Sequence, residues 1–330
     1  MKLRRYEEPV CVRAVAHTDI IEEVDCLQGA SEHDVEAESS GPRKTGTQGQ
    51  SVAQRWLTAI VAIPVVLVFV WLGGWIAFAA TALVVLLGTL ELHTMLLHGG
   101  YRPLVWISLG LSMLFLIAAM LPQSRLLILE IGLGGSLLVS FPWLFFRHKL
   151  DGAMIDWALT LAMSIYLGWP MGFFLLLRGY EPGEFLGFHD SWISLPRGAW
   201  WLLVVLLGVW GFDSAAFFSG RYLGRHKLAP KISPAKTWEG VLGGFVLSIA
   251  AGLILTVNPL GVPWYLAILL GILIGVAAVL GDLAESLIKR QTHVKDSGQI
   301  MPGHGGMLDR IDSLLFAVIV VYVFAQLVGK

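Results

Sequence analysis

Three aspartates in the last fifty residues have the type and spacing of a metal site. Asp309 and Asp312 are three residues apart where a helix is expected to begin, so both carboxylates should project to one side. Asp282 ends the preceding apolar segment and can join them. Carboxylates suit Mg²⁺, which takes its other ligands from water and substrate phosphates. We therefore expect Asp282, Asp309 and Asp312 to bind one or two Mg²⁺ ions, with Asp213 supporting them or supplying a further ligand.

Positive charge surrounds these carboxylates. A Pro-Gly-His-Gly-Gly turn over residues 302–306 also lies between them, and its glycines allow close approach of the backbone to a ligand. The alternative is a charged loop with salt-bridged ends, but ionisable groups beside membrane spans usually have a function. His304 could donate to a phosphate oxygen or stabilise the turn. The cations expected to neutralise a polyanionic substrate are Lys289, Arg290, Lys295 and Arg310.

A second basic segment runs from Asp213 to Glu239. It contains no acid between those two residues, but it has five Lys or Arg and two prolines in what should be a short loop. A positive topology signal that touches anionic lipid head groups is one interpretation. Small hydroxyl residues beside lysines at a helix start are, however, typical of phosphate binding. The residues expected to hold phosphate are Lys231, Ser233, Lys236 and Thr237.

The elements that must position these groups are membrane helices. Of the 330 residues, 56% are hydrophobic and only 14% are charged, whereas soluble domains contain about 25% charged residues. Apolar runs of about 20 residues are long enough to cross a bilayer. We therefore predict an all-α polytopic membrane protein with about nine transmembrane helices. They cover residues 55–72, 75–96, 103–121, 125–146, 153–177, 199–219, 239–257, 264–285 and 311–328.

The charges of the loops predict the orientation of these spans. The loops on the side of the N-terminus carry twelve Lys or Arg residues and the opposite loops carry three, so the N-terminus should be cytoplasmic. In this arrangement the four key aspartates fall at one depth, near the cytoplasmic face. For Glu91 and Asp156, snorkelling or an interhelical hydrogen bond is the favoured interpretation. We expect a multi-pass protein of the cell (inner) membrane with its site facing the cytoplasm.

The first fifty residues differ in composition from the rest. Residues 1–50 carry ten acids against six Lys or Arg, and they contain both cysteines of the chain, Cys11 and Cys26. We interpret this segment as a solvated cytoplasmic tail with two reduced thiols and residues 51–330 as the transmembrane catalytic domain. The motifs lie within about residues 210–316. The net charge of −1 favours no nucleic-acid partner.

The motifs together resemble those of a known family. The stretch from Ser286 to Asp312 is similar to the signature of the phosphatidate cytidylyltransferases, or CDP-diacylglycerol synthases. It has the Ser, the Lys-Arg pair, Lys-Asp-Ser-Gly, Pro-Gly-His-Gly-Gly, Asp-Arg and a further Asp, in order. Residues 231–240 and the Asp213 region are similar as well. The resemblance extends from about residue 51 to the end and is strong from Trp210 to Phe316, but the polar tail departs from it.

The resemblance implies a reaction between CTP and phosphatidic acid. A phosphate oxygen of phosphatidate would attack the α-phosphorus of CTP, giving CDP-diacylglycerol for phospholipid synthesis and releasing pyrophosphate. The acyl chains would enter from the membrane lipid, and a homodimer is implied as a possible assembly. The residues independently suggest such chemistry, because joining two polyanions requires metal ions and cations more than a covalent nucleophile.

Two other functions remain open at this point. A CTP-dependent kinase of an isoprenoid alcohol would need the same metal and nucleotide contacts but would release CDP. A secondary transporter would also have many spans and intramembrane acids, although its acids usually lie near the bilayer midplane between broken helices. The position of the aspartates near one face favours an enzyme.

Overall fold

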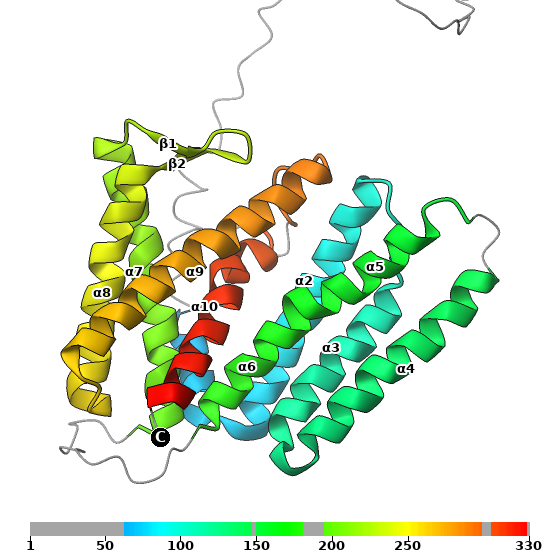
Figure 1. Cartoon of the computed structure of the whole chain (residues 1–330), viewed down its shortest axis with the longest axis horizontal. Helices are drawn as coiled ribbons and strands as arrows, with labels where there is room; N and C mark the ends of the chain where they lie inside the picture. The colour runs from blue at the N-terminus through cyan, green and yellow to red at the C-terminus, as the bar shows by residue number, and fades with distance from the viewer. Residues whose placement is uncertain (1–62, 147–149, 181–194, 299–304, 329–330) are drawn as a thin grey trace, which may run out of the picture. The chain divides into compact units, whose positions relative to one another are not determined.

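The computed structural model describes residues 63–146, 150–180, 195–298 and 305–328. The chain divides into two units, Met1–Gly46 and Thr47–Lys330, and every described residue belongs to the second. His304 and the tail therefore lie outside the described residues. The elements of the second unit (Figure 1) are α2 (Gly74–His98), α3 (Val105–Met120), η1 (Pro122–Ser124), α4 (Arg125–Phe145), α5 (Ala153–Met163), η2 (Ser164–Gly168), α6 (Trp169–Arg178), α7 (Arg197–Leu223), β1 (Lys227–Ala229), β2 (Ser233–Thr237), α8 (Trp238–Leu260), α9 (Trp264–Gln291) and α10 (Leu308–Val328).

Among the described residues, seven helical segments are long and apolar enough to cross a membrane. They are α2, Pro122–Phe145, Ala153–Arg178, α7, α8, α9 and α10. Two further predicted spans are shorter apolar helices, Ile63–Leu72 and Val105–Met120. A helix of 16 residues is only about 24 Å long, less than the hydrocarbon thickness of about 30 Å. The protein is thus an all-α, multi-pass membrane protein, and the count of nine spans stays a prediction.

The predicted break after the first apolar segment is confirmed. The helix Ile63–Leu72 ends at Gly73, where Gly73 and Gly74 have φ values of 64° and 53°. Side chains rarely allow this backbone conformation, so glycine is required at the break. Arg178 binds the end of the first helix, because its Nε donates to the Val70 carbonyl at 2.6 Å.

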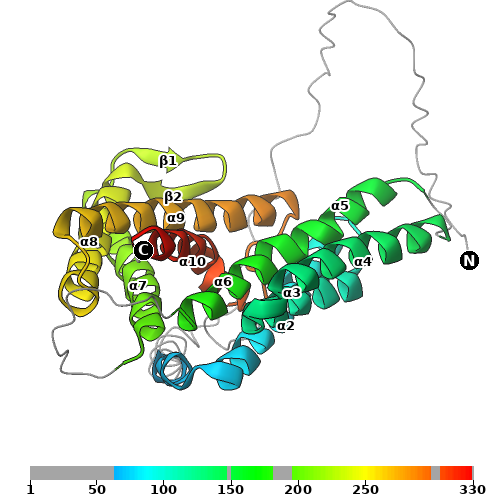
Figure 2. The ribbon, with the colours of Figure 1, turned by 60° about the horizontal axis from the view of Figure 1, so that its bottom comes forward.

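The helix α10 packs into two hydrophobic clusters. In the first, Val318 and Val321 of α10 contact the core formed with α7 and α9. In the second, Leu308 and Leu315 pack with Val85 of α2 and with residues of α3, η2 and α6. Figure 2 shows α10 between α9 and α6. The helix α10 therefore packs against α7 and α9 in one cluster and against α2 and α6 in the other.

The basic loop forms an antiparallel β-hairpin. Strands β1 and β2 pair Lys227 with Thr237 and Ala229 with Ser233. Glu239 in the first turn of α8 accepts from the His226 amide and contacts its ring Nδ1 at 2.6 Å. These contacts attach the start of the hairpin to α8. The sequence predicted a short loop here, and the strands give that loop a fixed register.

Candidate active site

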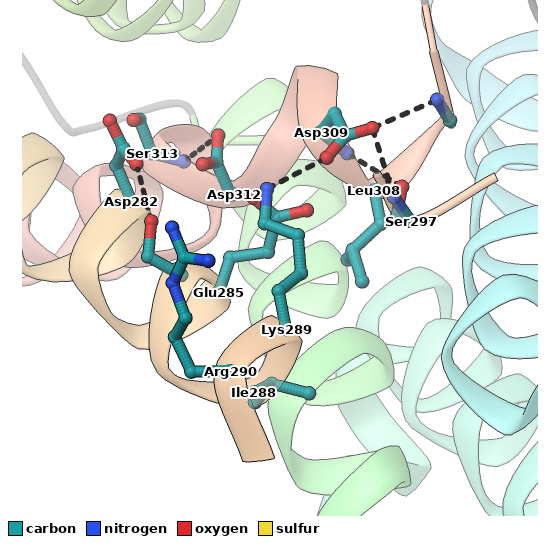
Figure 3. Close-up of polar contacts among 12 residues, drawn as sticks. Asp282, Glu285, Ile288, Lys289, Arg290, Ser297, Leu308, Asp309, Asp312 and Ser313 are labelled. Atoms are coloured by element: carbon teal, nitrogen blue, oxygen red, sulfur yellow. Dashed lines mark hydrogen bonds and ion pairs between the residues drawn. The ribbon is translucent and has the colours of Figure 1, made fainter. Parts of the chain in front are cut away.

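Aspartates from three neighbouring helices lie in one region of the fold. Asp213 of α7, Asp282 of α9 and Asp312 of α10 are close enough for their negative charges to interact. Asp282 accepts from Ser286 Oγ at 3.4 Å, and Asp312 accepts from the Ser313 amide at 2.7 Å. Figure 3 shows Asp282 and Asp312 beside each other. We call Asp213, Asp282 and Asp312 the aspartate centre.

A glycine allows two of these helices to approach. A Cβ at Gly281 of α9 would lie 2.9 Å from the Cα of Ser313 and would also meet the carbonyl of Asp312. Real Cβ contacts are not this short, so a side chain at this position would force α9 and α10 apart. The absence of a side chain at Gly281 thus allows Asp282 and Asp312 to lie close together.

The hairpin brings a cation to the aspartate centre. Lys236 of β2 forms an ion pair with Asp282. Ser233 is half-buried and Lys231 is exposed on the same hairpin. Arg290 of α9 donates from Nε to the Ile232 carbonyl at 3.1 Å, which holds the hairpin over α9. The two motif regions predicted from the sequence therefore meet in space.

Thr237 has a structural role at the start of α8. Its side chain is buried, and Oγ1 accepts from the Gly240 amide at 3.2 Å. This is the geometry of an N-cap, in which a hydroxyl satisfies an amide that has no partner within the helix. The phosphate contact predicted for Thr237 would have to be made alongside this bond.

The third predicted metal ligand, Asp309, lies in a different network (Figure 3). Its Oδ1 is 2.9 Å from Nζ of Lys289, which is also 2.6 Å from Oε2 of Glu285. Its Oδ2 accepts from the amides of Gly306 and Ser297 at 2.9 and 3.3 Å. The spacing of Asp309 and Asp312 correctly placed both in one turn of α10, but only Asp309 forms an ion pair with Lys289.

The structure does not gather the three expected metal ligands into one cluster. Asp282 and Asp312 lie beside each other, whereas Asp309 binds Lys289. Across the part of the chain that the structure describes, no group of three or more His, Cys, Asp or Glu side chains is arranged to hold a metal ion. The chemistry of the aspartate centre nevertheless fits a divalent cation, since its like charges repel one another and Lys236 supplies one positive charge.

The other predicted cations lie in α9, in α10 or in the segment between these helices. Lys295, Arg290 and Arg310 are exposed, so their side chains can reach a ligand from solvent. His304, predicted to bind phosphate or stabilise the turn, lies outside the described residues. These residues stay candidates for binding the triphosphate.

Two buried glutamates have roles that the motifs did not indicate. Glu285 is only 1% exposed and pairs with Lys289 one helical turn later, an i,i+4 spacing that could have signalled the pair. Glu91 of α2 is hydrogen-bonded to the start of α10. Asp156 accepts from the Arg102 amide at 2.6 Å. For Glu91 and Asp156 the hydrogen-bond interpretation is therefore confirmed.

Comparisons with known proteins give a consistent assignment. Residues 53–328 match the Cytidylyltransferase family. The phosphatidate cytidylyltransferase of Synechocystis sp. is 36% identical over 304 residues, which cover 83% of this chain and 96% of that protein. The phosphatidate cytidylyltransferase of Staphylococcus haemolyticus is 34% identical over 268 residues, or 80% of this chain and 95% of that protein. The enzyme of the same name from Haemophilus influenzae is 47% identical over 137 residues, or 39% and 46% of the two chains. The chain therefore belongs to the cytidylyltransferase family, as the motifs between Ser286 and Asp312 predicted.

Proposed function

We propose that this protein transfers the cytidylyl group of CTP to phosphatidic acid, giving CDP-diacylglycerol and pyrophosphate. The observation that carries this proposal is the ion pair of Lys236 with Asp282, beside Asp312, in a membrane protein of this family. An oxygen of the phosphatidate phosphate forms the new bond to the α-phosphorus of CTP. The bond between the α- and β-phosphates breaks, and its electron pair leaves with pyrophosphate.

The cations bind and orient the two phosphorylated substrates. Lys236 is held by Asp282 at the aspartate centre, where its ammonium group can also contact a phosphate. Arg290, Lys295 and Arg310 are exposed near the ends of the same helices and would neutralise the triphosphate and the departing pyrophosphate. Phosphatidate is largely ionised near neutral pH, because phosphate monoesters have a second pKa of about 6. No general base is required for the attack.

The aspartate centre is the proposed place for magnesium. Asp282 and Asp312, with Asp213, would hold one or two Mg²⁺ ions. The bound ion would neutralise charge on the phosphates that react. Lys289 and Asp309 form an ion pair beside this centre, and we assign them a supporting role in holding α9 against α10.

The membrane arrangement completes the proposal. Nine spans with a cytoplasmic N-terminus would place the aspartate centre near the cytoplasmic face of the inner membrane, where CTP is available. Phosphatidic acid would reach it from the lipid phase. This arrangement would also allow a homodimer. The mass of the protein in its detergent complex would show whether one forms.

Labelled nucleotide distinguishes this reaction from the alternatives. Purified protein in detergent is incubated with phosphatidic acid, Mg²⁺ and CTP that carries label at the α- or the γ-phosphorus. We expect only the α-label in the lipid fraction, together with pyrophosphate. The variant D282N should insert normally but lose at least hundredfold in turnover. Transfer of the γ-label to an added prenol would instead identify a lipid kinase and refute the proposal. Transfer of the α-label that D282N leaves unchanged would refute the role of Asp282.

A further inference from the structure

We propose that Glu91 of α2 is a positioning residue of the cytidylyl transfer. It binds the backbone at the start of α10 and so fixes the turn that carries Asp309 and Asp312. This inference rests on the proposed function, because it assigns a role within that reaction. Glu91 lies outside the motif-bearing segment, more than two hundred residues before α10 in the sequence.

Two consecutive amides at the start of α10 donate directly to this carboxylate, and a third donates to a hydroxyl that the carboxylate binds. Glu91 Oε1 accepts from the Met307 amide and Oε2 from the Leu308 amide, both at 2.9 Å. Ser297 extends the network, since its hydroxyl donates to Glu91 Oε2 at 3.4 Å and accepts from the Asp309 amide at 3.4 Å. The first amides of a helix have no partner within it. A side chain from another helix supplies that partner here.

The charge of Glu91 suits this position. Its side chain is only 4% exposed, so the carboxylate is removed from water and needs hydrogen bonds from the protein. The N-terminus of a helix carries a partial positive charge, which favours an anion there. Amides that donate to a carboxylate form stronger bonds than amides that donate to a neutral acceptor. The first turn of α10 is therefore held by charge as well as by its apolar contacts.

The glycines of the motif allow the backbone to reach this carboxylate. A Cβ at Gly298 would lie 2.6 Å from Glu91 Oε1, and a Cβ at Gly306 would lie 2.7 Å from Oε2. Gly305 has a φ of +85°, a conformation that side chains rarely adopt. The sequence suggested that this turn approaches a ligand. In its described part, Gly306 instead packs against Glu91.

A continuous set of contacts leads from Glu91 to the aspartate centre. Leu308, whose amide Glu91 binds, is followed directly by Asp309, and Asp312 lies one turn further along α10. Asp309 in turn binds Lys289 of α9, which fixes α10 to the helix that carries Asp282. Movement of the first turn of α10 would change the separation of Asp282 and Asp312.

The substitution E91Q tests this role with little change in volume. Glutamine replaces one acceptor oxygen by an NH₂ group, which would face an amide donor. We expect at least a tenfold loss of kcat, equivalent to about 1.4 kcal/mol. KM for CTP should change less than about threefold, because Glu91 binds α10 and not the nucleotide. The Mg²⁺ concentration that gives half-maximal activity should rise severalfold, since Asp312 is displaced.

Hydrogen exchange gives a readout that does not depend on turnover. In E91Q, the amides of a peptide that spans residues 305–312 should exchange at least tenfold faster than in the wild type, because two of their acceptors are weakened. The matched control is D156N, which alters another buried carboxylate that binds a backbone amide, that of Arg102. D156N should lower thermal stability but leave kcat, the Mg²⁺ requirement and exchange at 305–312 unchanged.

Each outcome decides the inference. Wild-type kcat and exchange in E91Q would overturn it, and so would equal losses in D156N, because those would indicate general destabilisation. If E91Q does not fold, S297A provides the test, because it removes only the hydrogen bonds of the Ser297 hydroxyl. It should lower kcat and speed exchange at 305–312 in the same way as E91Q, but by smaller factors. Unchanged exchange in S297A would then overturn the inference. A wild-type protein that transfers no α-label would refute the proposed function, whereas the exchange experiment would still test the contact.

Discussion

Lys289 joins two acidic side chains, and its removal would leave a buried carboxylate without a counter-charge. Its Nζ lies 2.6 Å from Glu285 Oε2 and 2.9 Å from Asp309 Oδ1. The side chain of Glu285 is 2% exposed, so water cannot replace the ammonium group. Breaking a buried ion pair by removing one partner costs about 3–5 kcal/mol. We expect K289M to lower the free energy of unfolding by about this amount, which is more than a hundredfold in the folded-to-unfolded ratio.

A second substitution separates the loss of charge pairing from the loss of side-chain packing. In E285Q/K289M the buried carboxylate is gone as well, so most of the stability should return. The remaining loss should be about 1.5–3 kcal/mol for the missing bond between Lys289 and Asp309. The free energy of unfolding is measured for K289M, E285Q and E285Q/K289M by denaturant titration in mild detergent. Tryptophan fluorescence reports the unfolding. Strong non-additivity is expected because the residues are in contact.

Two results would contradict this role of Lys289. If K289M and E285Q/K289M are destabilised equally, the unpaired carboxylate of Glu285 is not the cause of the loss in K289M. If K289M retains wild-type stability, the contact carries no free energy of folding, and the supporting role assigned to Lys289 and Asp309 is wrong.

Three further substitutions test the geometry of the site. G281A should lower the free energy of unfolding by about 1–3 kcal/mol and reduce activity, because its Cβ would meet the backbone at Ser313. The control G134A has open space around the new Cβ, so its melting temperature should be unchanged or slightly higher. T237A should lose about 1 kcal/mol through the missing N-cap of α8, and T237S should retain most of that stability. D309N should insert normally but lose turnover in the labelled CTP assay, because its charge no longer holds Lys289; full activity would refute any role in the site.

The sequence predicted the helices well because their signal is local. Each apolar run contains its own evidence of length and composition, so each of the nine predicted segments contains a helix, with boundaries that differ by a few residues. The break at Gly73–Gly74 was predicted on the same grounds. The sequence could not predict that the loop with Lys231 and Lys236 pairs as a hairpin, because its prolines and short strands resemble an irregular loop.

The partners of the aspartates were harder to predict than their types. Asp282, Asp309 and Asp312 share residue type and depth, and nothing in the sequence separates the one that binds Lys289 from the two that face each other. Tertiary contacts make that division. Glu91 was recognised only as a membrane carboxylate with an expected hydrogen bond, because its partners lie in the distant segment around Met307.

The acids of this site fall into two groups, those that accept several hydrogen bonds from the protein and those that lie near other acids. The two groups should differ in how substitution changes stability and activity. Glu91 and Asp309 each accept several hydrogen bonds from the protein, so their charge is used to hold the start of α10. Asp213, Asp282 and Asp312 lie near like charges, and such an arrangement is stabilised when a cation or a cationic side chain lies between them.

Neutralising Glu91 or Asp309 should therefore lower both the stability and the activity of the protein. Neutralising Asp282 should abolish activity with little net change in stability, because relief of the repulsion between the aspartates offsets the loss of the ion pair with Lys236. Comparing melting temperature with turnover across these variants tests the division, and a loss of stability in D282N as large as that in E91Q would contradict it.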